Sequence, residues 1–307
     1  MTPLVSVGLP VFNGARYVRQ AVESILSQTH RDFELIVSDN GSTDDTEQIC
    51  REYAARDRRV QYYRSRANRG ASWNFRHVVA LARGKYFKWM SHDDVCRDKF
   101  LERCVPVLDG DTSVVLCYPR TADIDEHGNF RKEKNFDLNV SDRRADVRFR
   151  SLICVNHSCF AVFGLVRLNA LRRTPVMADY VPADRALLAE LGLLGRFHEV
   201  PEVLFLHREH PLRSTRAVPQ LQARIAWFDP AKAGRTTFPN WRLLVEYARC
   251  IGRAGLPIVE RARCYAQLLP WLKFNARLLY EDLLYPIRRR AERNRAAGRC
   301  GAVHRST

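Results

Sequence analysis

The chain has 307 residues, of which 46% are hydrophobic and 10% aromatic, and its formal net charge at pH 7 is +16. This length and apolar content exclude an intrinsically disordered protein and favour one large domain, or one domain with an appendage. The first residues lack the charged region and the long apolar run of a signal peptide. No stretch reaches the roughly 20 apolar residues that span a bilayer, so we expect a cytoplasmic protein.

The nine cysteines are spread along the chain, and no two of them form a C-x-x-C pair. This spacing argues against a structural zinc site and, in a chain of this length, against the disulfide framework of a small secreted protein. We therefore expect the cysteines to be reduced.

The first part of the chain alternates predicted strands and helices. Apolar and β-branched runs predict strands at Leu4–Leu9, Phe33–Ser38, Val60–Tyr63 and Tyr86–Met90. Apolar residues at helical spacing predict helices at Ala15–Gln28, from Thr46 onward, and after Gly70 through Leu81. Pro10 is expected to end the first strand. Such alternation is typical of βαβ units, so the sequence predicts an α/β protein with a mostly parallel sheet flanked by helices.

The polar loops that follow these strands are predicted to meet. In a parallel sheet the carboxyl ends of the strands lie at one edge, where ligands bind. Four loops would line this cleft, namely Phe12–Asn13, Asp39–Asn40, Asn68–Gly70 and Asp93–Asp94. No G-x-G-x-x-G sequence opens a helix and no Gly-rich loop ends in Lys-Ser/Thr, which argues against a dinucleotide site and against a P-loop.

Asp93 and Asp94 stand side by side where a buried strand is expected to end. Two neighbouring anions repel each other unless a positive or donor-rich group lies nearby. A hard divalent cation, Mg²⁺ or Mn²⁺, held by carboxylate oxygen and completed by substrate phosphates, meets this requirement. A solvated turn or a helix N-cap is the alternative, because aspartate favours both.

Further along, a strand is expected at Ser113–Tyr118, a hairpin-like excursion at Thr121–Phe130, and a helix with its loop at Arg143–Asn156. Several motifs, in the family's order, resemble the family 2 glycosyltransferases, whose nucleotide-binding fold is called GT-A. They are Pro10–Gly14, Ser27–Thr29, Phe33–Asp44, Asn68–Gly70 and Ser91–Asp94, within a resemblance that spans roughly residues 4–216. The resemblance implies inverting transfer of a sugar from a nucleotide diphosphate sugar.

In the family, the residue that matches Asp39 accepts a hydrogen bond from the nucleobase. A carboxylate at a strand end can accept a ring N–H of uracil or guanine, whereas adenine offers no such donor. A UDP-, dTDP- or GDP-linked sugar is therefore the expected donor. Capping of the helix near Thr46 is the alternative role for Asp39.

The resemblance places other donor contacts in two further loops. The first loop, with Pro10, Phe12 and Asn13, is expected to pack on the base and the ribose. Asn68 and Gly70 suit a close backbone approach to ribose or phosphate, although an ordinary turn would use the same residues.

In the acid pair, Asp94 matches the family's metal ligand, and Asp93 would hold ribose or donor-sugar oxygens directly or through water. The sequence departs from the family's Asp-x-Asp pattern at His92, where an acid or a small residue often stands. A divalent metal, Mg or Mn, is the cofactor that the resemblance implies.

The segment Leu204–Ser214 resembles the family's R-x-H segment. His210 is expected to complete the metal site, and Arg208 to neutralise the leaving phosphates. A surface ion cluster is the alternative, and His207 is a weaker candidate than either.

Asp184 begins a predicted helix after Pro182 and resembles the family's general base. Inverting displacement needs a carboxylate opposite the leaving group that takes the proton of the acceptor hydroxyl. The alternative is an acid that the helix dipole favours, and Asp179 is the nearest rival. His157 is a further catalytic candidate, but a lone histidine beside an apolar run is more often structural.

The C-terminal part is strongly basic. Residues 231–307 contain 16 Lys/Arg and 5 Asp/Glu, which accounts for +11 of the net charge. Helices are predicted at Pro239–Ile251 and Ile258–Tyr285, with Pro270 and Pro286 breaking or bounding them, and the residues from Arg288 onward are expected to fray. Basic helices with Trp, Phe and Leu suit an anionic membrane surface, and equally suit packing on the catalytic domain.

These expectations combine into a GT-A catalytic domain over residues 1–216 and a helical basic extension over 217–307. The nucleotide-sugar half would end near residue 118, and 119–216 would form the acceptor half. The implied role is cell-envelope glycan or glycolipid synthesis on a glycan or lipid-linked acceptor, with peripheral contact at the inner face of the plasma membrane and no specific nucleic acid. The alternatives are a nucleotidyltransferase, which would need a Gly-rich basic first loop, and a basic nucleic-acid-binding protein.

Overall fold

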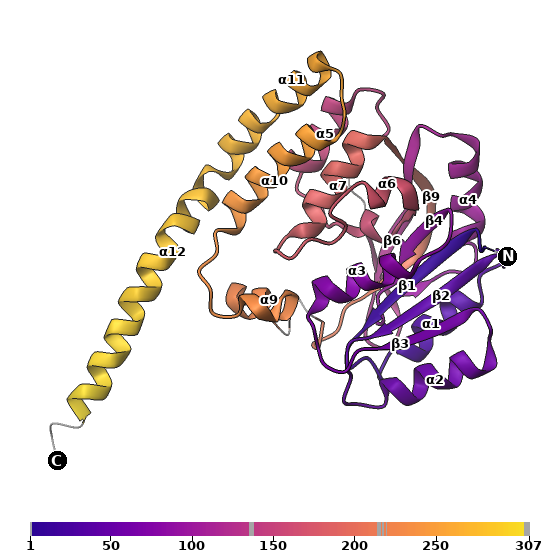
Figure 1. Ribbon diagram of the computed structural model, residues 1–307, viewed down its shortest axis with the longest axis horizontal. Coiled ribbons are helices and arrows are strands. Elements are labelled where there is room, and N and C mark those ends of the chain that lie inside the picture. Colours follow the sequence, from indigo (N-terminus) through magenta and orange to yellow (C-terminus); the bar gives the residue numbers. More distant parts are fainter. Residues whose placement is uncertain (1, 135–137, 214–215, 217, 219, 304–307) are drawn as a thin grey trace.

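The computed structural model describes residues 2–303 except 135–137, 214–215, 217 and 219, with side chains as far as residue 285 (Figure 1). The strands are β1 (Val5–Val11), β2 (Phe33–Asp39), β3 (Val60–Arg64), β4 (Tyr86–Trp89), β5 (Val95–Cys96), β6 (Val114–Ile124), β7 (Phe130–Lys134), β8 (Leu165–Arg167) and β9 (Arg196–Arg208). The helices before the extension are α1 (Val18–Leu26), α2 (Thr46–Arg56), α3 (Ala71–Leu81), α4 (Phe100–Gly110), α5 (Ala145–Cys154), the 3₁₀ helix η1 (Phe160–Phe163), α6 (Leu168–Arg172) and α7 (Ala183–Leu194).

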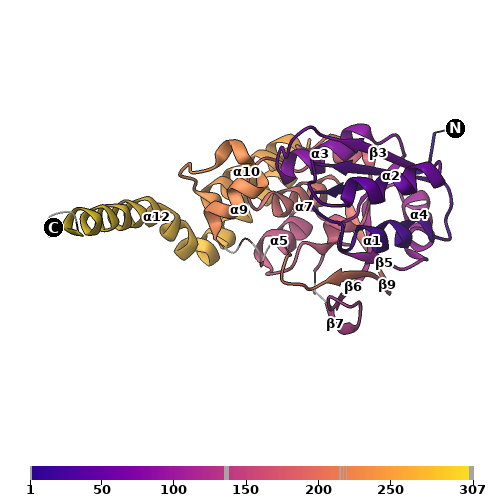
Figure 2. The ribbon, with the colours of Figure 1, turned by 90° about the horizontal axis from the view of Figure 1, so that it is seen from below.

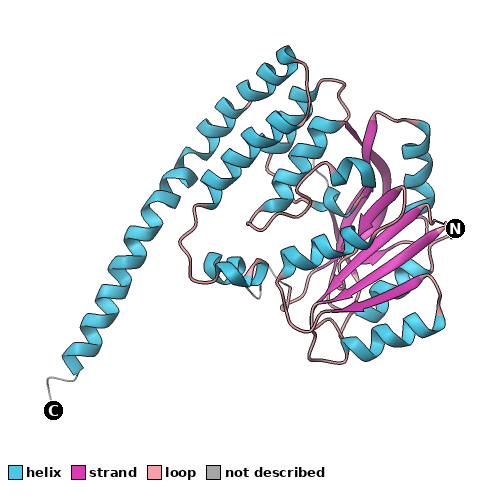
Figure 3. Ribbon diagram, viewed as in Figure 1, coloured by secondary structure: helices cyan, strands magenta, loops and turns pink. Residues whose placement is uncertain are grey.

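In the described part of the chain nine strands form one sheet, in the order β3-β2-β1-β4-β8-β6-β9-β5, with β7 paired to β6. The strands β3, β2, β1 and β4 pair in parallel, as do β6 and β9, whereas β8 runs antiparallel to both β4 and β6. Helices lie on both sides of the twisted sheet (Figure 3). The predicted α/β class, with a sheet of this kind flanked by helices, is confirmed.

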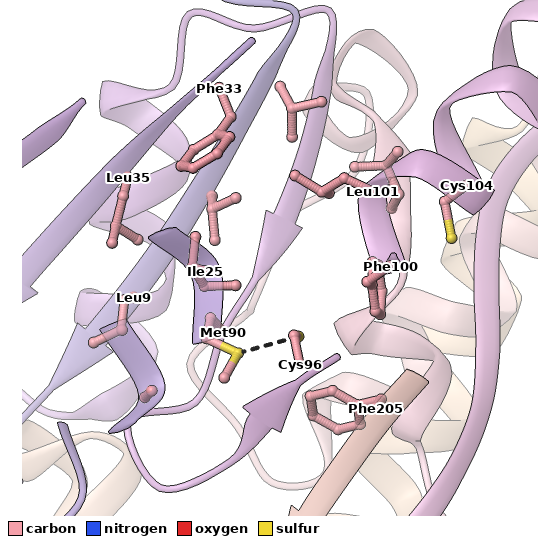
Figure 4. Close-up of a cluster of buried hydrophobic side chains, with 14 of the residues drawn as sticks. Leu9, Ile25, Phe33, Leu35, Met90, Cys96, Phe100, Leu101, Cys104 and Phe205 are labelled. Carbon is pink, nitrogen blue, oxygen red and sulfur yellow. Dashed lines mark hydrogen bonds between the residues drawn. The ribbon is translucent and has the colours of Figure 1, made fainter. Parts of the chain in front are cut away.

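Two apolar layers hold the helices on the sheet. One layer packs α1, α2 and α4 against β1, β2 and β4, and Figure 4 shows its residues, including Leu9, Ile25, Leu35 and Phe100. The other layer packs α3, α5, α6 and α7 on the opposite face of the sheet. Both faces of the central strands are buried, which explains why those strands are apolar at almost every position.

Three predicted boundaries are wrong. The first strand continues through Pro10 to Val11. Its pairing with β4 ends at Gly8, so no hydrogen bond to β4 is lost at Pro10, which has no N–H to donate. The predicted strand after Ser113 and the start of the excursion are one strand, β6, which continues to Ile124 because β9 pairs along it. Pro286 does not end the last helix, because residues with high helix propensity follow the proline.

The extension contains α9 (Leu221–Phe228), the 3₁₀ helix η2 (Pro230–Lys232), α10 (Pro239–Arg253), α11 (Ile258–Ala266) and α12 (Leu268–Val303). α10 packs on α7 and α12, and Figures 1 and 2 both show the far half of α12 leaving the body of the molecule. Within the described residues, no helix combines the length and the apolar character needed to cross a membrane. The boundary at residues 216–217 stays a prediction.

Asp282 of α12 caps the first turn of α10, whose backbone N–H groups have no partner within the helix. Its carboxylate accepts hydrogen bonds from the backbone N–H of Asn240 at 2.7 Å and from the Asn240 side chain at 3.0 Å. Replacing Asp282 by Ala should lower the free energy of unfolding by about 1–2 kcal/mol, because these part-buried donors lose their acceptor. Urea denaturation followed by circular dichroism measures the loss.

The matched control is Glu281→Ala, one residue away, because Glu281 pairs at 2.8 Å with Arg277 on the surface of the same helix. This substitution should change stability by less than about 0.5 kcal/mol. Equal losses in the two variants would contradict the capping role of Asp282.

Candidate active site

Asp93 and Asp94 lie in the loop between β4 and β5, at the carboxyl edge of the parallel strands. Both are buried, with 9% and 3% of their surface exposed. The backbone N–H of Arg208, at the end of β9, donates to Asp94 Oδ1 at 2.9 Å. The Arg208 Nε–H donates to the backbone carbonyl of Asp93 at 2.8 Å. The end of β9 therefore fixes both acids.

The two carboxyl groups have opposite pKa shifts. Burial and the negative charge of Asp93 raise the pKa of Asp94 well above its usual value. Burial also acts to raise the pKa of Asp93, but the neighbouring His92 and the hydrogen bonds from His210 and Ser91 outweigh it, so that pKa lies below its usual value. When one acid of such a buried pair is ionised, the other loses its proton only if a positive group lies nearby. A bound cation would supply that positive charge.

His210 lies directly beside this pair. Its Nε2 is 2.9 Å from Asp93 Oδ2, a carboxylate oxygen that accepts a hydrogen bond from this nitrogen, and in the neutral ring Nδ1 is then left as an acceptor. Nδ1 is buried and has no hydrogen-bond partner among the described residues. The ring lies 4.8 Å from that of Tyr17, whose hydroxyl group is likewise buried and unpartnered within the described structure. The other ring nitrogen of His210 bonds Asp93, so Nδ1 is a buried imidazole nitrogen left without a partner in the described part of the chain, which is a ligand atom that suits Mn²⁺ or a similar divalent cation.

Arg208 is 1% exposed, and its guanidinium group contacts three parts of the protein. Besides the Asp93 carbonyl, Nη1 donates to the carbonyls of Asp125 at 3.1 Å and Glu126 at 3.2 Å, in the turn between β6 and β7. Nη2 donates to Gln20 Oε1 of α1 at 2.5 Å. These contacts make Arg208 a positioning residue for the acid pair, and its predicted contact with the donor phosphates stays a prediction.

The first loop touches the acid-pair loop through Gly14. A Cβ atom on Gly14 would lie 2.6 Å from the ring of His92, so this close approach requires glycine. Asn13 has φ +50° and accepts a hydrogen bond at its Oδ1 from the backbone N–H of Thr43 at 2.9 Å. Phe12 is 36% exposed beside these residues, whereas Pro10 is buried in β1.

Asp39 is fully buried at the end of β2, and both of its carboxylate oxygens have partners. Oδ1 accepts from the backbone N–H of Ser42 at 2.8 Å, and Oδ2 accepts from the Tyr62 hydroxyl at 2.7 Å. Arg64 Nε approaches Oδ2 at 3.3 Å. Asp39 does not cap the helix near Thr46, since Asp44 bonds that residue instead. Its predicted contact with the nucleobase stays untested.

Asn68 and Gly70 are tied to the second loop by Asn40. The Asn40 side-chain amide donates to Asn68 Oδ1 at 2.9 Å and to the Gly70 carbonyl at 3.1 Å. Gly70 has φ +87°, and a Cβ atom there would lie 2.5 Å from Pro230 at the start of η2. The glycine is thus needed for its backbone conformation and for the approach of the extension.

Asp184 lies in the first turn of α7, as predicted, and its Oδ1 accepts a 2.9 Å hydrogen bond from its neighbour's backbone N–H. Burial raises the pKa of the Cys159 thiol, and the nearby charge of Asp184 adds to the effect. Phe160, next to Cys159, packs 4.7 Å from the ring of His207. Among the contacts of the described residues, none joins Asp184 directly to Asp93 or Asp94, so their opposition across a substrate stays a prediction.

Two other candidates have structural contacts. His157 is buried, with Nε2 3.0 Å from the Leu152 carbonyl, and burial lowers its pKa, which favours the structural alternative. The rival base Asp179 pairs with Lys232 of η2 at 2.8 Å. Lys232 therefore joins the extension to the loop before α7.

Asp123, His207 and Glu209 form a second group that could hold a cation, with ligand atoms within 4.8 Å of one another. Register between β6 and β9 brings Asp123 opposite His207. This group already has positive partners, since Lys134 lies 2.9 Å from Asp123 and Arg216 lies 2.8 Å from Glu209.

Lys88 is a buried residue of β4, and the sequence pattern indicates no role for it. Its ammonium group donates to the carbonyl of Phe163 at 2.6 Å and lies 4.1 Å from the Phe100 ring. Burial lowers its pKa. The signal in the sequence was a single lysine inside an apolar strand, and the contacts show that it ties η1 to the strand that leads to the acid pair.

The profile described as Glycosyl transferase family 2 matches residues 6–172. Over 226 residues the chain is 33% identical to an uncharacterized glycosyltransferase of Rickettsia prowazekii, covering 72% of this chain and 69% of that protein. The crystal structure of S. aureus TarS 1–349 in complex with UDP-GlcNAc aligns with a TM-score of 0.62 and 14% identity, covering 88% of this chain and 73% of that one. The mannosyltransferase PcManGT of Pyrobaculum calidifontis, in complex with GDP-Man and Mn²⁺, aligns with a TM-score of 0.50 and 16% identity. This alignment covers 92% of this chain and 87% of that one.

The fold is that of GT-A enzymes, and the predicted fold is therefore confirmed. The protein is a glycosyltransferase, and the chain belongs to glycosyl transferase family 2. The family assignment supports neither the nucleotidyltransferase nor the nucleic-acid-binding alternative.

Replacing Arg208 by Lys tests whether this residue positions the acid pair. A lysine keeps the charge but cannot contact the Asp93 carbonyl, the β6–β7 turn and Gln20 together, so the free energy of unfolding should fall by about 2–4 kcal/mol. Thermal and urea denaturation measure the loss. Arg120→Lys is the control, because Arg120 makes a part-exposed 3.1 Å pair with Glu199. An unchanged stability in the Arg208 variant would contradict the positioning role.

Proposed function

We propose that this glycosyltransferase moves a sugar from a UDP-, dTDP- or GDP-linked donor to an acceptor hydroxyl with inversion at the anomeric carbon. The observation that carries the proposal is the buried acid pair, Asp93 and Asp94, at the carboxyl edge of the sheet, with Asp94 held by the end of β9 and Asp93 bonded to His210. The neighbours with UDP-GlcNAc and GDP-Man bound support a nucleotide-sugar donor. The acceptor is proposed to be a glycan or a lipid-linked glycan of the cell envelope.

The donor would lie across the three loops that follow β1, β2 and β3. Phe12 is exposed there and would cover the base, while Pro10 and Asn13 shape the loop around it. Asp39 is proposed as the acceptor for a base N–H, with its orientation set by Tyr62. The loop of Asn68 and Gly70, which the Asn40 side chain holds in place, is proposed to contact the ribose or the phosphates.

The residues that would hold a divalent metal are Asp94 and His210. His210 offers Nδ1, and its hydrogen bond through Nε2 to Asp93 fixes the ring. When bound, Mg²⁺ or Mn²⁺ would neutralise charge that develops on the leaving diphosphate, an effect worth several kcal/mol. Asp93 would contact ribose or sugar oxygens, and Arg208 would add positive charge near the phosphates while it holds the loop.

Asp184 is proposed as the general base. In a single displacement the acceptor oxygen attacks the anomeric carbon from the side opposite the diphosphate, and the bond to the phosphate oxygen breaks. A carboxylate on the attacking side takes the hydroxyl proton as the new bond forms. Asp184 lies at the start of α7, near Cys159 and outside the loops that follow β1, β2 and β3, which supports a role on the proposed acceptor side.

Asp184→Asn should lower nucleotide diphosphate release by about 10²–10⁴-fold, because the amide cannot take the proton. The assay incubates a panel of UDP-, dTDP- and GDP-sugars with Mg²⁺ or Mn²⁺ and candidate acceptors. Donor binding, read as a thermal shift, should remain. Asp179→Asn is the control and should retain activity within about threefold; an inactive Asp179 variant beside an active Asp184 variant would reverse the assignment.

Mn²⁺ should raise the Tm of the parent protein, because a ligand that binds the folded state stabilises it. Asp94→Asn should abolish this shift, since the substitution removes a carboxylate ligand. Asp123→Asn, from the second acid and histidine group, is the matched control and should keep the shift. A shift lost in the Asp123 variant and kept in the Asp94 variant would move the metal to that second group.

A further inference from the structure

A continuous apolar stripe runs along α11 and α12. Its members are spaced by three or four positions and so share one helical face. Gln267, between the two helices, has helical backbone angles of φ −71° and ψ −13°, so the phase continues from one helix to the next. The stripe consists of Ile258, Ala262, Tyr265, Leu269, Leu272, Ala276, Tyr280 and Leu283.

Most of this stripe faces solvent, and Leu272 is its part-buried member. The exposed fractions are 73% for Ile258, 68% for Leu269, 61% for Tyr280 and 50% for Leu283. The residues that bind the helices to the rest of the protein lie on a different face, where Cys264, Trp271, Leu279 and Asp282 are buried. The main attachment of the extension to the catalytic half therefore lies outside the stripe, from which Leu272 borders that apolar cluster and Tyr265 donates to the Ala248 carbonyl at 3.3 Å.

The same segment is rich in positive charge. Residues 231–307 carry 16 Lys/Arg against 5 Asp/Glu. The backbone of α12 remains helical to Val303, and this last part contains six arginines between positions 288 and 299. Figures 1 and 2 show it extending away from the catalytic body. The extension thus combines exposed apolar side chains with a high density of cations.

We propose that the stripe on α11 and α12 lies on an anionic lipid bilayer, with the two helices parallel to the membrane plane. Exposed aliphatic and aromatic side chains on one face would enter the boundary between headgroups and acyl chains. Lysines and arginines are attracted to anionic headgroups. From Ile258 to Leu283 the stripe is about 39 Å long at 1.5 Å per residue, which gives the contact a defined direction.

Other occupants match fewer of these observations. Nucleic acid would meet the cations but leave the apolar side chains exposed to water. A second copy aligned in parallel on the same stripe would bring two strongly basic segments together. The membrane proposal does not depend on the identity of the sugar or on the roles of Asp94 and Asp184, so it can fail or hold separately from the proposed function.

The test is flotation of the full chain with phosphatidylcholine vesicles, with and without about 30% phosphatidylglycerol, at low and high salt. The parent should float with the anionic vesicles and largely remain unbound with the neutral ones. Leu269→Glu/Leu283→Glu places two acids on the stripe and should reduce the bound fraction by about tenfold or more. Circular dichroism should show an unchanged fold, because both side chains are exposed.

The matched control is Phe274→Glu/Leu278→Glu. It adds the same two charges to the same helix on the other flank, where Phe274 is 69% exposed and Leu278 44%. The control should retain binding within about threefold. Equal losses in the two variants, no flotation of the parent, or a parent dimer in light scattering that the stripe variant alone dissociates, would overturn the proposal.

Discussion

Arg208 is the residue on which the candidate active site depends. A buried guanidinium group is costly unless its donors are satisfied, and here they meet the acid-pair loop, the β6–β7 turn and α1. The same residue supplies the backbone N–H that binds Asp94. Four segments that are distant in sequence are thereby fixed around one charge, and the negative field of the buried acids is partly balanced before any ligand arrives.

This arrangement separates two kinds of polar residue at the sheet edge. Asn13 and Asn40 bond neighbouring loops to each other and Asp39 bonds within its own loop, which gives these loops a fixed shape. His210 differs because one ring nitrogen is bonded to Asp93 and the other is buried without a partner in the described structure. Polar atoms of the second kind point to a ligand, because an unsatisfied buried acceptor is otherwise unfavourable.

The first half of the fold could be predicted because its buried strands are short apolar runs and the loops between them are short polar runs, so each element is visible from neighbouring residues alone. Prolines misled the prediction in two places, at Pro10 and Pro286. A proline destabilises a strand where its lack of an N–H removes a hydrogen bond to the neighbouring strand. At Pro10 the neighbouring strand β4 has already ended, so no bond to that strand is removed. Sequence alone does not contain that information.

The candidate site was predictable in part for the same reason. Strand ends place Asp39 and the acid pair at one edge, so their proximity follows from topology. The partners of Arg208 and the juxtaposition of Asp123 with His207 could not be predicted, because both depend on the register of β9 against β6. Lys88 was visible as an unusual residue, but its carbonyl partner lies 75 positions away.

The contact between α7 and α10 has a consequence for how the chain matures. The helix that carries Asp184 buries Ala189 and Leu193 against Tyr247, and Glu190 forms a double hydrogen bond with Arg253, at 2.9 Å for each contact. On the ribosome, α7 emerges some 60 residues before Arg253, counted from the sequence. Its outer surface therefore stays uncovered during that interval, and the part of the fold that contains α7 reaches its final packing after the strands β1 to β4.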